Sequence, residues 1–153
     1  MKRIASFSVN HDVLKKGMYI SRIDGDVVTY DVRMKLPNKG DYLPIAAMHT
    51  IEHLFATYAR NTKYESSIIY VGPMGCRTGF YFLVRDDISH AQALEIVRGS
   101  MRFIADYEGD IPGASSRECG NYREHDLPAA KAAARDMLGV LENWSEEKMT
   151  YEC

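Results

Sequence analysis

The stretch MYISRIDGDVVTYDVRMKL, residues 18–36, predicts a β-hairpin and sets the fold class. Asp24-Gly25 lies at its centre, and this dipeptide is a strong signal for a tight turn between antiparallel strands. We therefore expect strands over residues 18–23 and 27–36. The second is rich in valine, threonine and tyrosine, which fit extended backbone. Pro37 and the polar residues after it end this strand.

A second hairpin and a set of helices follow in the remaining sequence. We expect two further strands over 66–71 and 80–84 and a short edge segment over 4–9. We expect one helix over 44–60 and a second of about 17 residues that begins after a Ser89 cap. A third helix is expected to begin near Pro128, with Asp126 as its cap. This order predicts one α+β domain over residues 1–153, with a mainly antiparallel four-stranded sheet and helices packed on one face. Residues 145–153 are expected to form a polar tail.

Bulk properties exclude several classes of protein. The net charge is −2 with mixed signs along the chain, which argues against a nucleic-acid partner. No apolar run approaches the roughly 18 residues that span a bilayer, and the N-terminus lacks the apolar core of a signal peptide, so no membrane association is expected. We therefore predict a cytoplasmic protein. Its three cysteines are then free thiols, metal ligands or catalytic groups rather than a disulfide framework.

The expected helix over 44–60 carries the motif HTIEH, residues 49–53. His49 and His53 are four residues apart, so both side chains can reach one metal ion. Glu52 lies on the same half of the helix and is placed to move protons. The order H-x-x-E-H occurs in some metalloenzymes. The alternative is a polar helix face with two incidental histidines.

A catalytic metal site of this type takes a third protein ligand. The sequence leaves this ligand open among Cys119, Cys76, His125, His11 and any carboxylate. Cys119 precedes Gly120, which lets the backbone approach closely, and a thiolate with two imidazoles suits zinc, iron(II) or cobalt. An inert buried cysteine is the competing interpretation of Cys119. His125 is kept as a reserve ligand.

Three further residues are candidates for binding or chemistry. Cys76 lies in a glycine-rich loop beside Arg77, whose positive charge favours a thiolate, so it is an acid/base or nucleophile candidate. It can equally be a small residue in a tight turn. Arg33 lies on a strand and is expected to pair with an anion or carboxylate, unless it is an edge residue that reaches solvent. His11 lies in a polar turn and by itself suggests only a surface histidine.

Three motifs in register now point to a family. They are HTIEHLFA at 49–56, PMGCRTGFY at 73–81 and Cys119-Gly120, with further matches at 6–7, 11–12, 30–33, 37–39 and 125–127. Together they resemble the S-ribosylhomocysteine lyase (LuxS) family, which makes the precursor of autoinducer-2. The resemblance covers nearly the whole chain.

The resemblance implies a role for each matching residue. His49, His53 and Cys119 correspond to the metal ligands, with iron(II) as the working metal and zinc or cobalt able to replace it. Glu52 corresponds to the general base and Cys76 to the second acid/base residue. The residues that correspond to the substrate pocket are Ser6, His11 and Arg33. The family is homodimeric, with its active sites at the subunit interface, which would explain a sheet face left to a partner.

The reaction implied is the cleavage of S-ribosylhomocysteine into homocysteine and 4,5-dihydroxy-2,3-pentanedione. The ribose carbonyl migrates from C1 to C3 by proton shifts, and the thioether at C5 then leaves by β-elimination. Negative charge that develops on the sugar oxygens needs a Lewis acid. Glu52 and Cys76, on opposite sides of the sugar, suit the removal and return of protons.

The chain departs from the family pattern before the Pro-Met-Gly-Cys motif. Family members commonly have Ile-Asp-Ile-Ser there, whereas this chain has Ile69-Tyr70-Val71-Gly72. Tyr70 occupies the acidic position associated with the amino-acid end of the substrate. Met34 also replaces the usual phenylalanine after Arg33. The departure therefore concerns how the homocysteine end is held.

Two other functions are weighed against the lyase. An inverzincin-like zinc peptidase shares H-x-x-E-H, but such chains are far longer and bring a carboxylate as third ligand. A peptidase would keep its activity when Cys76 becomes alanine. A non-catalytic, metal-binding divergent member of the family would bind metal yet release no thiol from S-ribosylhomocysteine.

Overall fold

The computed structural model describes residues 1–152, and Cys153 lies outside the described residues. Its strands are β1 (Gly17–Asp24), β2 (Val27–Arg33), β3 (Ile68–Pro73) and β4 (Gly79–Arg85). Its α-helices are α1 (Ile45–Ala59), α2 (His90–Ala105) and α3 (Leu127–Leu141), and short 3-10 helices are η1 (Ala5–Phe7), η2 (Glu65–Ser67) and η3 (Glu146–Met149). The predicted α+β class is confirmed.

The four strands form one antiparallel sheet in the order β1-β2-β4-β3. The predicted hairpin turn is present, and Gly25 supplies its left-handed conformation with φ of 59°. Pairing of β2 with β4 joins the two hairpins at the centre of the sheet. We expected the second strand to continue to Leu36, but it ends at Arg33. The amides of Met34 and Lys35 both donate to the Thr78 carbonyl, at 2.8 and 2.9 Å, which turns the chain away.

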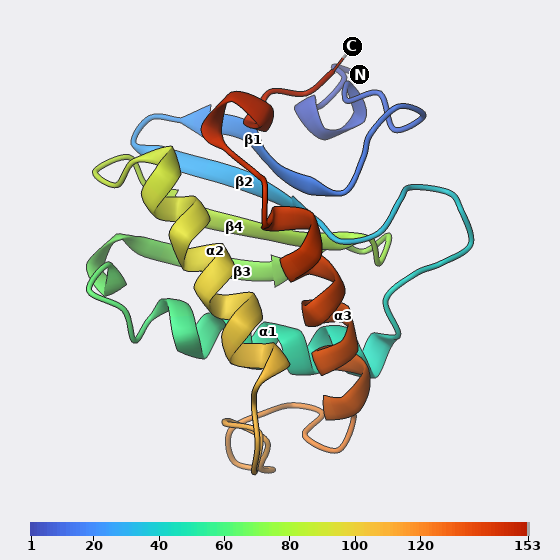
Figure 1. Ribbon diagram of the computed structural model, residues 1–153, viewed down its shortest axis with the longest axis vertical. Helices are drawn as coiled ribbons and strands as arrows, with labels where there is room; N and C mark the ends of the chain where they lie inside the picture. The colour runs from blue at the N-terminus through green and yellow to red at the C-terminus, as the bar shows by residue number, and fades with distance from the viewer. Residues whose placement is uncertain (153) are drawn as a thin grey trace.

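The helices cover one face of the sheet, as predicted (Figure 1). On β2, Tyr30 and Val32 point into the core and are fully buried, so Asp31 and Arg33 point to the opposite face. The Phe55 ring of α1 lies 5.3 Å from the Phe82 ring of β4. Burial of each such aromatic side chain contributes about 1.5–3 kcal/mol to the free energy of unfolding.

Both predicted helix caps are present. Ser89 and Gln92 form a capping box at the start of α2, with hydrogen bonds of 3.1 and 2.9 Å. The Asp126 carboxylate accepts the Ala129 amide at 3.0 Å at the start of α3. The Asp126 amide donates to Thr50 Oγ1 on α1 at 3.0 Å. This last contact fixes the chain just before α3 against the helix that carries the HTIEH motif.

The two ends of the described chain lie together beside β1 (Figure 1). The predicted edge segment over 4–9 is wrong, because residues 5–7 form the 3-10 helix η1. The amides of Phe7 and Ser8 donate to the Ile4 and Ala5 carbonyls, so these donors are not free to pair with β1. The C-terminal tail is polar in composition, yet Met149 is fully buried in the core. No helix within residues 1–152 has both the length and the apolarity needed to cross a bilayer.

Candidate metal centre and thiol pocket

The loop between α2 and α3 fixes the tautomer of the two motif histidines of α1. His49 Nδ1 lies 2.7 Å from the Glu124 carbonyl oxygen, and His53 Nδ1 lies 2.8 Å from the Pro112 carbonyl oxygen. A carbonyl oxygen only accepts, so each Nδ1 must carry the hydrogen. In its neutral form each ring therefore keeps the lone pair of its Nε2 for another partner. This is the usual arrangement around metal-binding histidines.

The loop also brings Cys119 to these rings. Its sulfur lies 3.3 Å from His49 Nε2, and the donor atoms of His49, His53, Cys119 and His125 all lie within 4.8 Å of one another. Ligands of a tetrahedral ion with bonds of about 2.0–2.3 Å are separated by about 3.5 Å. The donor set therefore fits a divalent ion, and its imidazole and thiol chemistry suits zinc, iron or cobalt.

His125 completes the cluster, although the sequence marked it only as a reserve ligand. Thr50 Oγ1 donates to the Ala46 carbonyl, so its contact of 3.0 Å with His125 Nδ1 is one in which the ring donates. His125 Nε2 is buried and has no hydrogen-bond partner within residues 1–152. Burial, with the charges of His49 and His53, lowers the pKa of His125 to about 4. A buried neutral imidazole with a free lone pair is a further sign that the cluster fits a metal ion.

Glu52 lies on the same helix, between the two histidines, and its side chain is half-buried. Its carboxylate accepts no hydrogen bond within residues 1–152. The group is therefore available to an incoming ligand. It lies next to the four potential metal-binding side chains His49, His53, Cys119 and His125, which we call the metal cluster.

The second candidate thiol lies on the turn between β3 and β4. Cys76 is exposed, and its turn is closed by hydrogen bonds from the Met74 amide to the Gly79 carbonyl and from the Arg77 amide to the Met74 carbonyl. At Gly79 an added Cβ would lie 2.1 Å from the Val32 carbonyl oxygen, so only glycine lets this turn approach β2. The Arg77 side chain is not directed at the Cys76 sulfur, because its Nε donates to the Leu43 carbonyl at 2.9 Å.

The cation connected to Cys76 is Arg33 rather than Arg77. Arg33 and Asp31 form a bidentate ion pair and are 3% and 1% exposed. Arg33 Nη1 donates to Thr78 Oγ1 at 2.8 Å, and Thr78 Oγ1 lies 3.1 Å from Cys76 Sγ. The sequence favoured a carboxylate or anion for Arg33, and the carboxylate is present. Thr78 was missed because a threonine in a turn carries no sequence signal for such a contact.

A pocket of about 180 Å³ opens beside this thiol, which we call the thiol pocket. Its lining residues are His11, Pro37, Asn38, Tyr42, Cys76 and Thr78. His11 is therefore placed with Cys76, whereas Ser6 lies on η1, half-buried, and does not line this pocket. Tyr70, the position of the family departure, is 55% exposed on β3.

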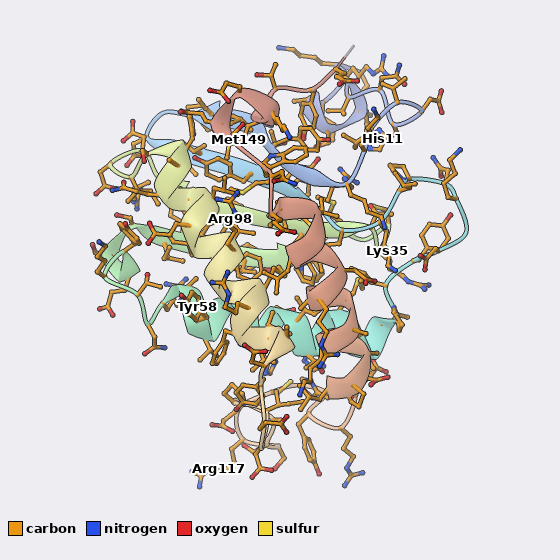
Figure 2. All side chains as sticks on the ribbon, viewed as in Figure 1. His11, Lys35, Tyr58, Arg98, Arg117 and Met149 are labelled. Carbon is orange, nitrogen blue, oxygen red and sulfur yellow. The ribbon has the colours of Figure 1, made fainter. Side chains whose placement is uncertain are left out.

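The metal cluster and the thiol pocket lie in different parts of the chain. Figure 2 shows His11 near one end of the long axis and Arg117, two residues before Cys119, at the other end. The structure therefore brings together His49, His53, Cys119 and His125, and separately His11, Cys76 and Arg33. It does not bring these two groups together within one chain.

The fold and the cluster of nitrogen and sulfur donors define a metal-binding α+β protein. Residues 4–148 match the family model S-Ribosylhomocysteinase (LuxS), and the chain therefore belongs to that family. It is 45% identical over 156 residues to the S-ribosylhomocysteine lyase of Clostridium acetobutylicum, with 99% of each chain covered. It is 46% identical over 157 residues to the S-ribosylhomocysteine lyase of Porphyromonas gingivalis strain W83, again with 99% of each chain covered. The resemblance drawn from the motifs is confirmed, and the peptidase alternative has no support.

Proposed function

We propose that this protein is an S-ribosylhomocysteine lyase that releases homocysteine and 4,5-dihydroxy-2,3-pentanedione, the precursor of autoinducer-2. The observation that carries this proposal is the metal cluster, in which backbone carbonyls occupy the Nδ1 atoms of His49 and His53 and the Cys119 sulfur lies 3.3 Å from His49 Nε2. This geometry occurs in a chain whose full-length relatives are named for this reaction. The product would serve signalling, and the released homocysteine would return to the methyl cycle.

We assign His49, His53 and Cys119 as the ligands of one divalent ion per subunit, with iron(II) preferred and zinc or cobalt able to bind. When bound, the ion would supply a Lewis acid for the negative charge that develops on the sugar oxygens. The preference for iron follows from the family resemblance, and the mixed imidazole and thiolate donors are compatible with it.

Glu52 and Cys76 are assigned to proton transfer. The Glu52 carboxylate lies on the helix of the ligands and accepts no hydrogen bond within residues 1–152, so it can take a proton from a carbon or hydroxyl of the bound sugar. The Cys76 sulfur lies next to Thr78 Oγ1, which is bound to the Arg33 cation, and this setting supports a thiolate that accepts and returns a proton. Two carriers let a proton leave one sugar carbon while another is returned to its neighbour. In the final step a proton is removed from C4 of the sugar while the homocysteine thiolate leaves C5.

The substrate pocket is assigned to Ser6, His11 and Arg33. His11 lines the thiol pocket, and Arg33 reaches it through Thr78. Arg33 is already paired with Asp31, so we expect it to act on Cys76 and the pocket wall rather than as a free anion binder. Tyr70 offers a hydroxyl where the family pattern has a carboxylate. We therefore expect weaker binding of the homocysteine ammonium group, which a carboxylate would pair with directly.

We further propose a homodimer in which each active site combines the metal cluster of one subunit with the thiol pocket of the other. The separation of the two groups within one chain supports this arrangement. Exposed apolar side chains, including Val13 and Leu36, line a hollow that also contains His11. A partner subunit that covers them would bury apolar surface beside the pocket. We expect the reaction to take place in the cytoplasm, because the proposed roles of Cys76 and Cys119 require both thiols to stay reduced.

The test is release of a free thiol from S-ribosylhomocysteine by protein prepared without oxygen and loaded with iron(II). We expect homocysteine to accumulate with the wild-type chain, and Cys76→Ala to retain the metal but release no homocysteine above background. Metal analysis accompanies each assay. An iron-loaded wild-type protein that releases no homocysteine would instead identify a non-catalytic, metal-binding member of the family.

A further inference from the structure

The C-terminal tail reaches the buried ion pair of β2. The Tyr151 hydroxyl donates to Asp31 Oδ2 at 2.7 Å. The same carboxylate accepts Arg33 Nε at 3.0 Å on Oδ1 and Arg33 Nη2 at 2.7 Å on Oδ2. Tyr151 therefore adds a third hydrogen bond to a carboxylate that has almost no access to water.

The other side of the ion pair leads to Cys76. Arg33 uses its remaining terminal nitrogen, Nη1, to donate to Thr78 Oγ1. Because Thr78 Oγ1 accepts this N–H, its own hydrogen is free to be donated to Cys76 Sγ, 3.1 Å away. Burial opposes the charge on Arg33, but the hydrogen bonds and charge of Asp31, with a smaller contribution from Cys76, raise the pKa of Arg33.

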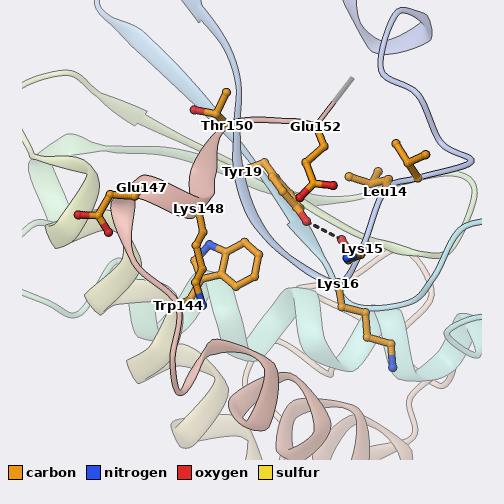
Figure 3. Close-up of a pocket in the computed structure, with 10 residues that line it drawn as sticks. Leu14, Lys15, Lys16, Tyr19, Trp144, Glu147, Lys148, Thr150 and Glu152 are labelled. Carbon is orange, nitrogen blue, oxygen red and sulfur yellow. Dashed lines mark hydrogen bonds between the residues drawn. The ribbon is translucent and has the colours of Figure 1, made fainter.

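The tail is anchored so that this hydroxyl has a fixed position. The Tyr151 ring stacks on the Tyr19 ring with centroids 5.0 Å apart. The Trp144 ring packs edge-on against Tyr19 at 5.5 Å, and its Nε1 donates to the Met18 carbonyl at 2.7 Å. Figure 3 shows Thr150, Tyr19 and Trp144 together around a cavity of about 430 Å³ beside β1.

The tyrosine stays a hydrogen-bond donor at all pH values where a thiol ionises. Burial raises the pKa of Tyr151 above its ordinary value, and the charge and hydrogen bond of Asp31 raise it further. Within residues 1–152, the groups that face Tyr151 are Asp31, Arg33 and the Tyr19 ring, with Ser21 nearby. None of these removes the hydroxyl hydrogen from its contact with Asp31.

We propose that Tyr151 is a positioning residue that acts on Cys76 through Asp31, Arg33 and Thr78. Its hydroxyl holds the Asp31 carboxylate in place and takes up part of its negative charge. Arg33 is then less strongly drawn to Asp31 and keeps Nη1 on Thr78, which donates to the sulfur. The purpose of this chain of contacts rests on the proposed function, because it matters only if Cys76 carries protons.

The experiment compares Tyr151→Phe with Tyr64→Phe in the full, metal-loaded chain. Each variant loses one hydroxyl that donates to a carboxylate, but Tyr64 donates to Glu95 at 3.4 Å, away from the thiol pocket. Alkylation of Cys76 by iodoacetamide is followed across a pH series by mass spectrometry of the tryptic peptide 64–77, in which Cys76 is the only cysteine. The other titratable groups at the pocket, His11 and Tyr42, are unchanged in both variants.

We expect Tyr151→Phe to move the half-maximal rate to higher pH and to slow alkylation at neutral pH about threefold, the effect of one weak hydrogen bond. Tyr64→Phe should follow the wild-type curve. A Tyr151→Phe curve that matches the wild type would overturn the proposal, even if the melting temperature falls, because that result would mean a purely structural role. A shifted curve in a protein that releases no homocysteine would refute the lyase function but leave this role of Tyr151 in place.

Discussion

The metal cluster and the thiol pocket each hold a sulfur atom, but they do so with different parts of the chain. Cys119 lies on a loop whose backbone carbonyls, at Pro112 and Glu124, bind the rings of α1. Cys76 lies on a turn that is bound by buried side chains of the sheet, through Thr78 and Arg33. The cluster therefore depends on loop conformation, whereas the pocket depends on side-chain charge and hydrogen bonding. Changes in backbone conformation should damage the first, and isosteric side-chain changes should damage the second.

The largest effect is expected from removal of a proposed metal ligand. Cys119→Ala should lose the metal and reduce homocysteine release to background, because the thiolate is the one anionic donor among the four side chains of the cluster and the neutral imidazoles that remain hold a divalent ion more weakly. His125→Ala should keep the metal with an affinity lowered by about tenfold, as expected for a group that supports the ligands. Metal content after dialysis and thiol release are the measurements. Equal metal loss in both variants would show that His125 binds the ion directly, as Cys119 is proposed to do.

The next effect concerns Glu52 and Cys76, the two proposed proton carriers. Glu52→Gln and Cys76→Ala should each lower kcat by about 10²–10⁴-fold while the metal is retained. If each site combines two subunits, mixing the two inactive variants after subunit exchange should restore about a quarter of the wild-type activity, because half of the dimers then contain one intact site. No recovery in a mixture shown to contain mixed dimers would place both residues of a site in one chain.

A smaller effect is expected where the loop approaches His53. Gly113 has φ of 75°, and an added Cβ would lie 3.2 Å from His53 Nδ1. Gly113→Ala should displace the ring from the Pro112 carbonyl and weaken metal binding by about tenfold or more. The matched control is Gly109→Ala, which has φ of 100° but no atom within 4 Å of the added Cβ. Metal titration followed by competition with a chelator separates loss of ring position from general strain in the loop.

The smallest effect is expected from an isosteric substitution in the thiol pocket. Thr78→Val removes the hydroxyl between Arg33 and Cys76 without changing the shape of a side chain that is only 2% exposed. We expect alkylation of Cys76 at neutral pH to slow about three- to tenfold and the free energy of unfolding to fall by about 1–3 kcal/mol. Metal affinity should be unchanged. Thr29→Val on β2 is the control, and an equal loss of thiol reactivity there would contradict the contact.

Much of the fold follows from local patterns in the sequence. The Asp24-Gly25 turn and the Ser89 and Asp126 caps carry local signals, and all three are present. The prediction of an edge segment over residues 4–9 was wrong. Weak alternation of apolar and polar residues cannot show whether the backbone amides pair with a strand or within a turn. The end of β2 at Arg33 was also missed, since it depends on a carbonyl at Thr78, which is 45 residues away.

The candidate site divides in the same way. Helical spacing placed His49 and His53 on one side of α1, and their orientation bears out that reasoning. The position of Cys119 beside them came from the family motifs, because a loop of this length has no periodicity to interpret. The contact from Tyr151 to Asp31 joins residues 120 positions apart. Neither residue carries a signal for the other, so this contact could be seen only in three dimensions.

The loop between α2 and α3 has a kinetic consequence. It is tied to α1 at Pro112, Cys119 and Glu124, through two ring nitrogens and a sulfur. We expect an ion bound in this cluster to leave mainly when the loop opens locally, so that its residence time depends on loop opening as well as on the ligand bonds. Hydrogen exchange of the amides around Cys119 should therefore slow on metal loading, and the rate of metal loss should follow the rate of that exchange.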